Sequence, residues 1–358
     1  MIYLLLSIII LFLIDILIIY SLKRLNCSGK NENNPVNISI IIAARNEAEN
    51  VDRLIDSMKN LNYPVELFEV IIVDDNSSDE TFEILKTKTE YLKNFSVLEF
   101  KSIGKTGKRE ALNFGISKSN YSNILVTDAD CSPQNNWLKS FAKKFQQGYH
   151  LLFGIAPFYQ RNNFVNRISC FENLRGSILS FSMASLGLPY TAAARNFGFS
   201  KKTFESLGGY SRTKDTISGD DDLLLREAIK NRMKIGVVNE TDSCVYSETK
   251  KTFKEYFRQR ARHTQTSFHY LKRHQIILGF WHLLNLAFVF SSLLIFFNPL
   301  FVILLPSKLI SDIVVVKLNQ KIFGYRFSVL EIFYLQIFYE ILLVFHFFNA
   351  RFSEIRWK

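Results

Sequence analysis

The distribution of apolar residues most limits what this chain can fold into, because they gather at both ends and leave a polar middle. Residues 2–20 are apolar except for Ser7 and Asp15, and about 20 such residues form a helix long enough to cross a bilayer. Further apolar stretches occupy 279–297, 299–316 and 329–348. The pattern predicts a membrane protein whose soluble domain lies between terminal helices.

The first apolar stretch is typical of a signal anchor rather than a cleaved signal peptide. No positive residue precedes it, no small-residue cleavage site follows, and Lys23 and Arg24 come directly after it. The positive-inside rule then places residues 23–273 in the cytoplasm. We therefore expect an integral protein of the plasma or inner membrane, with Asp15 packed against the later helices.

The topology of the C-terminal third is less determined. The stretch 299–316 contains Pro306, Lys308 and Asp312, so it is either a full span or a re-entrant segment, and we favour the span. Basic residues that favour the cytoplasm flank the last stretch on both sides: Lys317, Lys321 and Arg326 before it, and Arg351, Arg356 and Lys358 after it. One span cannot leave both groups in the cytoplasm, so the side of the C-terminus stays open.

Composition narrows the class of partner. The 44 basic and 33 acidic residues give a net charge of +11, which suits nucleotide phosphates, nucleic acid or a membrane surface. We expect no nucleic acid partner, because no recognised module is present and basic residues cluster beside the apolar stretches. The cysteines at 27, 131, 170 and 244 are too scattered for a zinc cluster, so reduced thiols are expected.

The polar middle predicts an α/β fold with a doubly wound, mostly parallel sheet. Short apolar strands alternate with stretches of helical spacing. The strands are expected at 37–43, 69–73, 97–100 and 123–127. The first helix is expected at 47–61, the second begins at Ser78 or Asp79, and the third is expected at 107–117. Ligands of such sheets bind beyond the carboxyl ends of the strands.

Acidic residues follow two of these strands. Asp74, Asp75 and Asp79 follow the second, while Asp128 and Asp130 follow the fourth. Each group alone could cap a helix or form a polar turn. Together their carboxylates would repel, and a Mg²⁺ or Mn²⁺ ion would remove the conflict with the hard oxygen ligands that these ions prefer. Because protein-bound magnesium usually also coordinates substrate phosphates, a diphosphate ligand is implied.

Two further clusters each allow two interpretations. Asp220, Asp221 and Asp222 precede a helix that runs to about Asn231, and they either cap it or direct one carboxylate into the site as a base. The basic block 258–263 precedes the first C-terminal stretch. It suits lipid headgroups and equally suits a diphosphate, which arginine binds in bidentate fashion.

Five motifs in order resemble the membrane-bound branch of the family-2 glycosyltransferases, which have the GT-A fold, over about 39–263. They are Ala44-Arg45-Asn46-Glu47, the stretch from Asp74 to Thr81, Gly107-Lys108 with Ala111-Leu112-Asn113 and Gly115, Asp128-Ala129-Asp130, and Arg195-Asn196 with Gly208-Gly209. Asp220 falls where the family has its catalytic base, although Gly219 departs from the usual Glu-Asp. Gln259, Arg262 and His263 fall on Gln-x-x-Arg-Trp, with histidine replacing tryptophan.

The resemblance implies an inverting transfer from a nucleotide-sugar to a lipid-linked or saccharide acceptor at the membrane, in cell-envelope or surface glycan synthesis. Asp220 would be the base, and Asp130 with Asp128 would hold Mg²⁺ or Mn²⁺. The implied nucleotide-sugar contacts are Ala44, Arg45, Glu47, Asp75, Lys108 and Asp128. The implied diphosphate or acceptor contacts are Asn196, Gln259, Arg262 and His263.

Two alternatives remain. A processive polysaccharide synthase is disfavoured because four spans are few for an enclosing channel and His263 replaces the family's tryptophan. A non-catalytic, membrane-tethered binding protein is disfavoured because Asp128, Asp130 and Asp220 are all retained.

The expected domains are an anchor (1–22), a linker (23–37), a GT-A domain (38–273), a membrane domain of two or three spans (274–350) and a tail (351–358). The stretch 162–185 is either a helix at the membrane interface or one covering the sheet.

Overall fold

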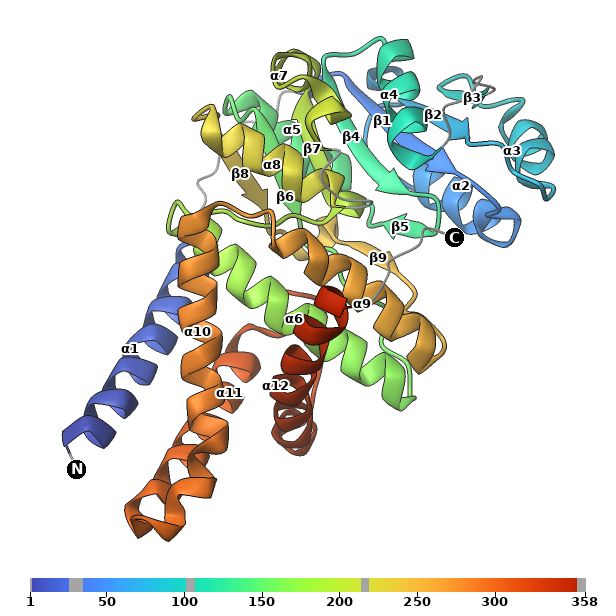
Figure 1. Ribbon diagram of the computed structural model, residues 1–358. Helices are drawn as coiled ribbons and strands as arrows, with labels where there is room; N and C mark the ends of the chain where they lie inside the picture. Colours follow the sequence, from blue (N-terminus) through green and yellow to red (C-terminus); the bar gives the residue numbers. More distant parts are fainter. Residues whose placement is uncertain (1, 26–34, 101–106, 214–218, 353–358) are drawn as a thin grey trace. The chain divides into compact units, whose positions relative to one another are not determined.

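The computed structural model (Figure 1) describes residues 2–25, 35–100, 107–213 and 219–352. Two compact units are present. The sheet unit comprises Gly29–Tyr159 and Thr191–Glu248, and the helical unit comprises Met1–Ser28, Gln160–Tyr190 and Thr249–Lys358. Most of the expected linker, with Cys27, and the tail beyond residue 352 lie outside the described residues.

The sheet unit is built on a mostly parallel sheet, which confirms the expected fold class. Its strand order is β3-β2-β1-β4-β7-β6-β8. The strands are β1 (Ile38–Ala44), β2 (Phe68–Asp74), β3 (Phe95–Glu99), β4 (Asn123–Asp128), β6 (Leu151–Gly154), β7 (Phe197–Ser200) and β8 (Ile235–Val238). The first four pair in parallel, whereas β7 runs antiparallel to both β4 and β6. A second, two-stranded sheet joins β5 (Cys131–Pro133) to β9 (Val245–Ser247).

Apolar side chains from the central strands fix the core of this unit. Ile40 and Ile42 of β1 are fully buried, and so are Trp137 and Phe141 of α5. The helices are α2 (Val51–Lys59), α3 (Thr81–Thr89), α4 (Lys108–Lys118), α5 (Trp137–Gln146), α7 (Lys201–Ser206) and α8 (Asp220–Lys230). The sheet brings α4 especially close, since a Cβ added to Gly115 would lie 2.7 Å from Ile41 Cγ2.

The helical unit contains α1 (Ile2–Leu25), α6 (Phe164–Ser185), α9 (Phe253–Ser267), α10 (Lys272–Phe290), α11 (Leu304–Asn319) and α12 (Val329–Phe352). Within it, α1, α10 and α11 run side by side (Figure 1). Among the described residues, three helices are long and apolar enough to cross a membrane: Leu6–Leu25, Pro299–Asn319 and Val329–Phe352. The favoured interpretation of 299–316 as a full span agrees with its length and composition.

The expected stretch 279–297 differs from a single continuous helix. The α-helix ends at Phe290, and a 3₁₀ segment, η6 (Ser291–Phe296), follows. The hydroxyl of Ser291 donates a hydrogen bond of 2.6 Å to the Phe288 carbonyl. Such local bonds from serine compete with the regular helical pattern, which the apolar count alone does not reveal.

The boundary of the soluble domain also differs from the expected 38–273, because α6 and α9 group with the helical unit. Helix α6 packs on α1, where the hydroxyls of Ser182 and Ser21 lie 2.6 Å apart. It also pairs with α11, since Arg175 Nη2 lies 2.9 Å from Asp312 Oδ1. The position of 162–185 at the membrane interface stays a prediction.

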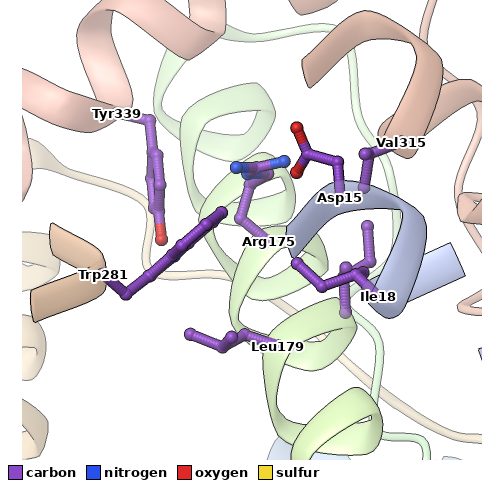
Figure 2. Close-up of a pocket in the computed structure, with 8 residues that line it drawn as sticks. Asp15, Ile18, Arg175, Leu179, Trp281, Val315 and Tyr339 are labelled. Carbon is purple, nitrogen blue, oxygen red and sulfur yellow. The ribbon is translucent and has the colours of Figure 1, made fainter. Parts of the chain in front are cut away.

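A buried polar cluster joins the helices of this unit. Asp15 accepts a hydrogen bond from Ser311 of α11, which confirms that it packs against a later helix. Lys308 of α11 lies 2.5 Å from Asp312 and 3.3 Å from Glu340 of α12. Figure 2 shows Asp15 and Arg175 at one small pocket with Trp281 and Tyr339. Buried charges are costly unless they are paired, so these contacts fix how the helices associate.

Candidate functional site

The candidate site lies in the sheet unit, where three parallel strands end side by side. The register pairs Ala44 of β1 with Asp74 of β2, and Ala43 with Asp128 of β4. The loops that follow β2 and β4 therefore leave the sheet at one edge. This is the edge at which ligands of doubly wound sheets bind, as the sequence predicted.

The first turn of α4 joins three of the predicted acids. The Gly107 N–H donates a 3.1 Å hydrogen bond to Asp75 Oδ1. The next residue, Lys108, forms an ion pair with Asp128, and Arg109 forms one with Asp220. Three successive residues of one helix start thus bring together acids from β2, β4 and α8.

The charged groups around Lys108 favour a permanent positive charge on its side chain. Burial lowers the pKa of Lys108, but the carboxylate of Asp128 opposes that effect and leaves the pKa above its ordinary value. Lys108 is therefore protonated at neutral pH and offers a fixed charge to an anionic ligand. The opposite case is Asp221, whose pKa is raised well above its usual range by burial and then by Asp222 and Asp220.

Two loops beside this helix start are joined by backbone contacts. The Asp75 N–H donates to the Ala44 carbonyl at 2.8 Å. Arg45 Nη1 lies 3.9 Å from Asp75 Oδ2, and the Asp75 residue is 3% exposed. Ala44 therefore acts through its backbone, while Arg45 and Asp75 form a pair at the predicted nucleotide position.

The remaining residues of the first loop hold it to the second. Asn46 adopts a φ of 55°, a left-handed conformation that asparagine tolerates. Its side chain accepts a 2.8 Å hydrogen bond from the Ser78 N–H. The Glu47 N–H donates to Thr81 Oγ1 at 2.8 Å, and the Glu47 carboxylate accepts from Asn50. The predicted nucleotide-binding opening is thus a pair of loops joined by hydrogen bonds.

The ligand set after β4 fits a hard divalent cation. Asp128, Asp130 and Cys131 each offer one ligand atom within 4.8 Å of the others. Burial raises the pKa of the Cys131 thiol well above its usual range, and Asp130 and Asp128 raise it further. The thiol therefore stays protonated, which leaves two carboxylates of the kind that Mg²⁺ and Mn²⁺ prefer. Arg53 Nη2 fixes the loop by donating to the Asp130 carbonyl at 2.9 Å.

The three acids at the start of α8 have different surroundings. Gly219 precedes them with a φ of 84°, a left-handed value that glycine adopts readily. Asp222 is buried and accepts hydrogen bonds from Thr191 Oγ1 at 2.7 Å and the Ala192 N–H at 2.9 Å. Asp222 thus holds the loop at 191–192, while Asp220 is the member of the cluster paired with α4.

Asn196, expected to contact diphosphate or acceptor, is instead fully buried. Its Oδ1 accepts a 2.9 Å hydrogen bond from Trp137 Nε1, and its Nδ2 donates to the Ile155 carbonyl at 2.7 Å. An amide engaged on both sides is a structural element of the core. The spacing of the motif located the residue correctly but did not reveal which way its side chain points.

Replacing Asn196 by alanine tests this structural role. Because Trp137 Nε1 and the Ile155 carbonyl would lose their partner inside the protein, the free energy of unfolding should fall by about 1–3 kcal/mol. Thermal unfolding of the full-length protein in detergent measures this as a lower midpoint. A variant of unchanged stability whose KM for the acceptor is raised would instead support the original expectation.

Gln259, Arg262 and His263 belong to the helical unit, on α9. Gln259 and Arg262 are partly buried and His263 is exposed. Their neighbour Arg260 pairs with Glu172 of α6, with Nε and Oε2 2.6 Å apart. Their contact with a diphosphate or acceptor stays a prediction.

Sequence reasoning missed Arg109 and Arg53, which contact Asp220 and the Asp130 backbone. A signal for Arg109 was present, since it follows Lys108 in the first turn of a predicted helix. Arg53 lies 77 positions from Asp130, and nothing in the local sequence links the two.

Comparisons with known proteins identify the family that this chain is similar to. The family model described as glycosyl transferase family 2 matches residues 39–207. The probable glycosyltransferase YdaM of Bacillus subtilis (strain 168) is 26% identical over 294 residues, covering 74% of this chain and 66% of the relative. The beta-monoglucosyldiacylglycerol synthase of Trichormus variabilis is 34% identical over 110 residues, covering 31% of this chain and 24% of the relative. The chain thus spans less than two thirds of each of these curated relatives.

Among solved structures, this chain is similar to the mannosyltransferase PcManGT from Pyrobaculum calidifontis, whose structure is a complex with GDP-Man and Mn²⁺. The TM-score is 0.60 at 15% sequence identity, with 98% of this chain and 99% of the other covered. At this identity the likeness supports the fold.

Proposed function

Since this chain belongs to the family-2 glycosyltransferases and has the GT-A fold, we propose that it transfers a sugar from a nucleotide-sugar to a lipid-linked or saccharide acceptor with inversion. The observation that carries the proposal is the first turn of α4, which contacts Asp75, Asp128 and Asp220. The residues that we propose as nucleotide contact, metal ligand and base thereby lie at one edge of the sheet.

On the donor side, Asp75, Arg45 and Glu47 bind the nucleoside. Asp130, with help from Asp128, would hold Mg²⁺ or Mn²⁺, and the ion would supply charge neutralisation for the departing diphosphate. Lys108 adds a fixed positive charge from the protein. Support comes from the two carboxylates beside a protonated thiol and from the structural neighbour PcManGT, which is a complex with GDP-Man and Mn²⁺.

On the acceptor side, Asp220 accepts the proton of the attacking hydroxyl as general base. The acceptor oxygen then forms the new bond at the anomeric carbon while the bond to the diphosphate breaks on the opposite face, which inverts the configuration. Arg109 orients the Asp220 carboxylate through their ion pair. Gln259, Arg262 and His263 of α9 contribute diphosphate or acceptor contacts.

The acceptor is lipid-linked or a saccharide, and the reaction takes place at the cytoplasmic face of the cell membrane. Three apolar helices long enough to span a membrane support the membrane location, and the basic residues Lys23 and Arg24 after the first of them support the cytoplasmic side. The name of the Trichormus relative, a beta-monoglucosyldiacylglycerol synthase, supports the acceptor class. Transfer of one or a few sugars fits this arrangement better than processive synthesis.

Removal of divalent metal tests the proposal. The purified full-length protein is incubated with membrane lipids and a panel of nucleotide-sugars, and release of nucleoside diphosphate is measured. We expect turnover of one donor, loss of that turnover with EDTA, and recovery when excess Mn²⁺ or Mg²⁺ is added. Turnover that persists in EDTA would contradict the metal site, and no turnover of any donor would favour a non-catalytic binding protein.

A further inference from the structure

Helix α12 satisfies the length and composition of a membrane span, but its flanking charges conflict with that role. Arg326 precedes the helix and Arg351 lies in its last turn. A crossing helix would put these two residues on opposite sides, although both favour the cytoplasm. Contacts within the helical unit decide between the two arrangements.

The N-terminal end of α12 is held beside the start of a segment that leaves the sheet unit. The Arg326 N–H donates to Gln160 Oε1 at 2.9 Å, and Gln160 Nε2 donates to the Arg326 carbonyl at 3.2 Å. Gln160 is bonded directly to Tyr159, the last residue of the sheet unit before this segment. This end of α12 therefore lies on the membrane side that carries the sheet unit.

The C-terminal end is held to α9, shortly after the chain leaves the sheet unit again at Glu248. Asn349 Nδ2 donates to the Phe257 carbonyl at 3.4 Å. One turn earlier, His346 Nε2 lies 3.1 Å from Tyr256 Oη. Helix α9 itself begins at Phe253, so Phe257 follows Glu248 closely along the chain.

The length of this connection excludes a crossing. Five extended residues from Glu248 to Phe253 span at most about 18 Å, and the four helical residues to Phe257 add about 6 Å. Their sum is less than the hydrocarbon thickness of about 30 Å. Phe257 cannot reach the far side of the bilayer from the sheet unit, and its hydrogen bond keeps Asn349 beside it.

The two faces of α12 differ in polarity. Its polar residues point into the protein, where Glu331 pairs with Arg167 and Glu340 with Lys308. Apart from Arg351 in the last turn, its exposed residues are apolar: Val329, Leu330, Phe333, Phe338, Ile341, Phe345, Phe347, Phe348 and Phe352. This apolar outward face suits contact with lipid acyl chains, and the chain connections described above place that contact in one leaflet.

We propose that α12 does not cross the membrane but lies in the leaflet on the side of the sheet unit, where its apolar face binds lipid acyl chains. Both groups of flanking basic residues then lie on one side, as the positive-inside rule prefers. The helix, with α6 and α9 against it, forms a lipid-binding platform on the side where the sheet unit lies.

Single-cysteine labelling tests the proposal in the full-length protein. The background carries Cys27→Ser; Cys131, Cys170 and Cys244 are buried. The reporters are Lys321→Cys before α12 and Arg351→Cys at its end, both exposed. Tyr91→Cys marks the sheet unit, and Phe296→Cys marks the segment between α10 and α11, with exposures of 88% and 91%. A membrane-impermeant maleimide is added to sealed vesicles of either orientation.

We expect the cysteines at 321, 351 and 91 to react in the same vesicle population and not in the other. The cysteine at 296 should react only in the opposite population, since α11 is long and apolar enough to cross the membrane between residues 296 and 321. Reaction of 351 in the population opposite to 321 would show that α12 crosses and would overturn the proposal. Because the readout is labelling, loss of glycosyl transfer does not affect the result.

Discussion

Replacing Asp130 by alanine should reduce glycosyl transfer at least ~10²-fold while the protein stays folded and inserted in the membrane. Asp130 and Asp128 are the carboxylates that would hold the divalent ion, and such an ion contributes several kcal/mol of charge stabilisation, with each 1.36 kcal/mol equal to a tenfold change in rate. Initial rates with the preferred donor at saturating Mn²⁺ measure the effect.

The matched control is Asp52→Asn, which removes an acid from the surface of the same unit. Its side chain is 70% exposed and pairs with Lys88, so transfer should be unchanged. An Asp130→Ala variant that transfers at the normal rate in the presence of chelator would show that catalysis does not depend on this site.

The second large effect concerns Asp220. The Asp220→Asn variant should lose ~10²–10⁴ in turnover, the usual contribution of a general base, because the amide cannot accept the proton of the acceptor hydroxyl. Donor binding should stay near normal, since the base contacts only the acceptor. Titration of nucleoside diphosphate with Mn²⁺ measures binding, and initial rates measure transfer.

Asp221→Asn is the matched control at the adjacent position. Asp221 has a raised pKa from burial and its acidic neighbours, so its neutral amide mimic should keep most of the activity. If the two variants exchange these behaviours, the base is Asp221 and the assignment is wrong by one residue. If both are fully active, the acids only cap α8, and the base lies elsewhere.

Local patterns predicted the parallel half of the sheet well. Strands β1, β2 and β4 are buried on both sides and therefore read as continuous apolar runs. Their ends are marked by Asp74 and Asp128, and the acids that follow lie at one edge because parallel strands share a direction. Topology and family resemblance thus predicted that Asp75, Asp128 and Asp220 lie close together. No sequence pattern identified α4 as the element that joins them.

The rest of the fold could not be predicted from local patterns because it depends on contacts between distant parts of the chain. Strands β6 and β7 have four residues each, too few for a periodic signal, and β7 enters the sheet from a distant part of the chain in the antiparallel direction. The side-chain direction of Asn196 depends on Trp137, 59 positions away. The grouping of α6 with α1 likewise depends on contacts such as Ser182 with Ser21, which neither local sequence reveals.

The stereochemistry of the product tests the central claim most directly. The full-length protein in native membrane lipids is supplied with a nucleotide-sugar labelled with ¹³C at the anomeric carbon, and the extracted product is analysed by NMR. We predict a lipid-linked or saccharide product whose anomeric configuration is opposite to that of the donor, formed by the wild type and not by Asp220→Asn. A product that retains the donor configuration would contradict the account.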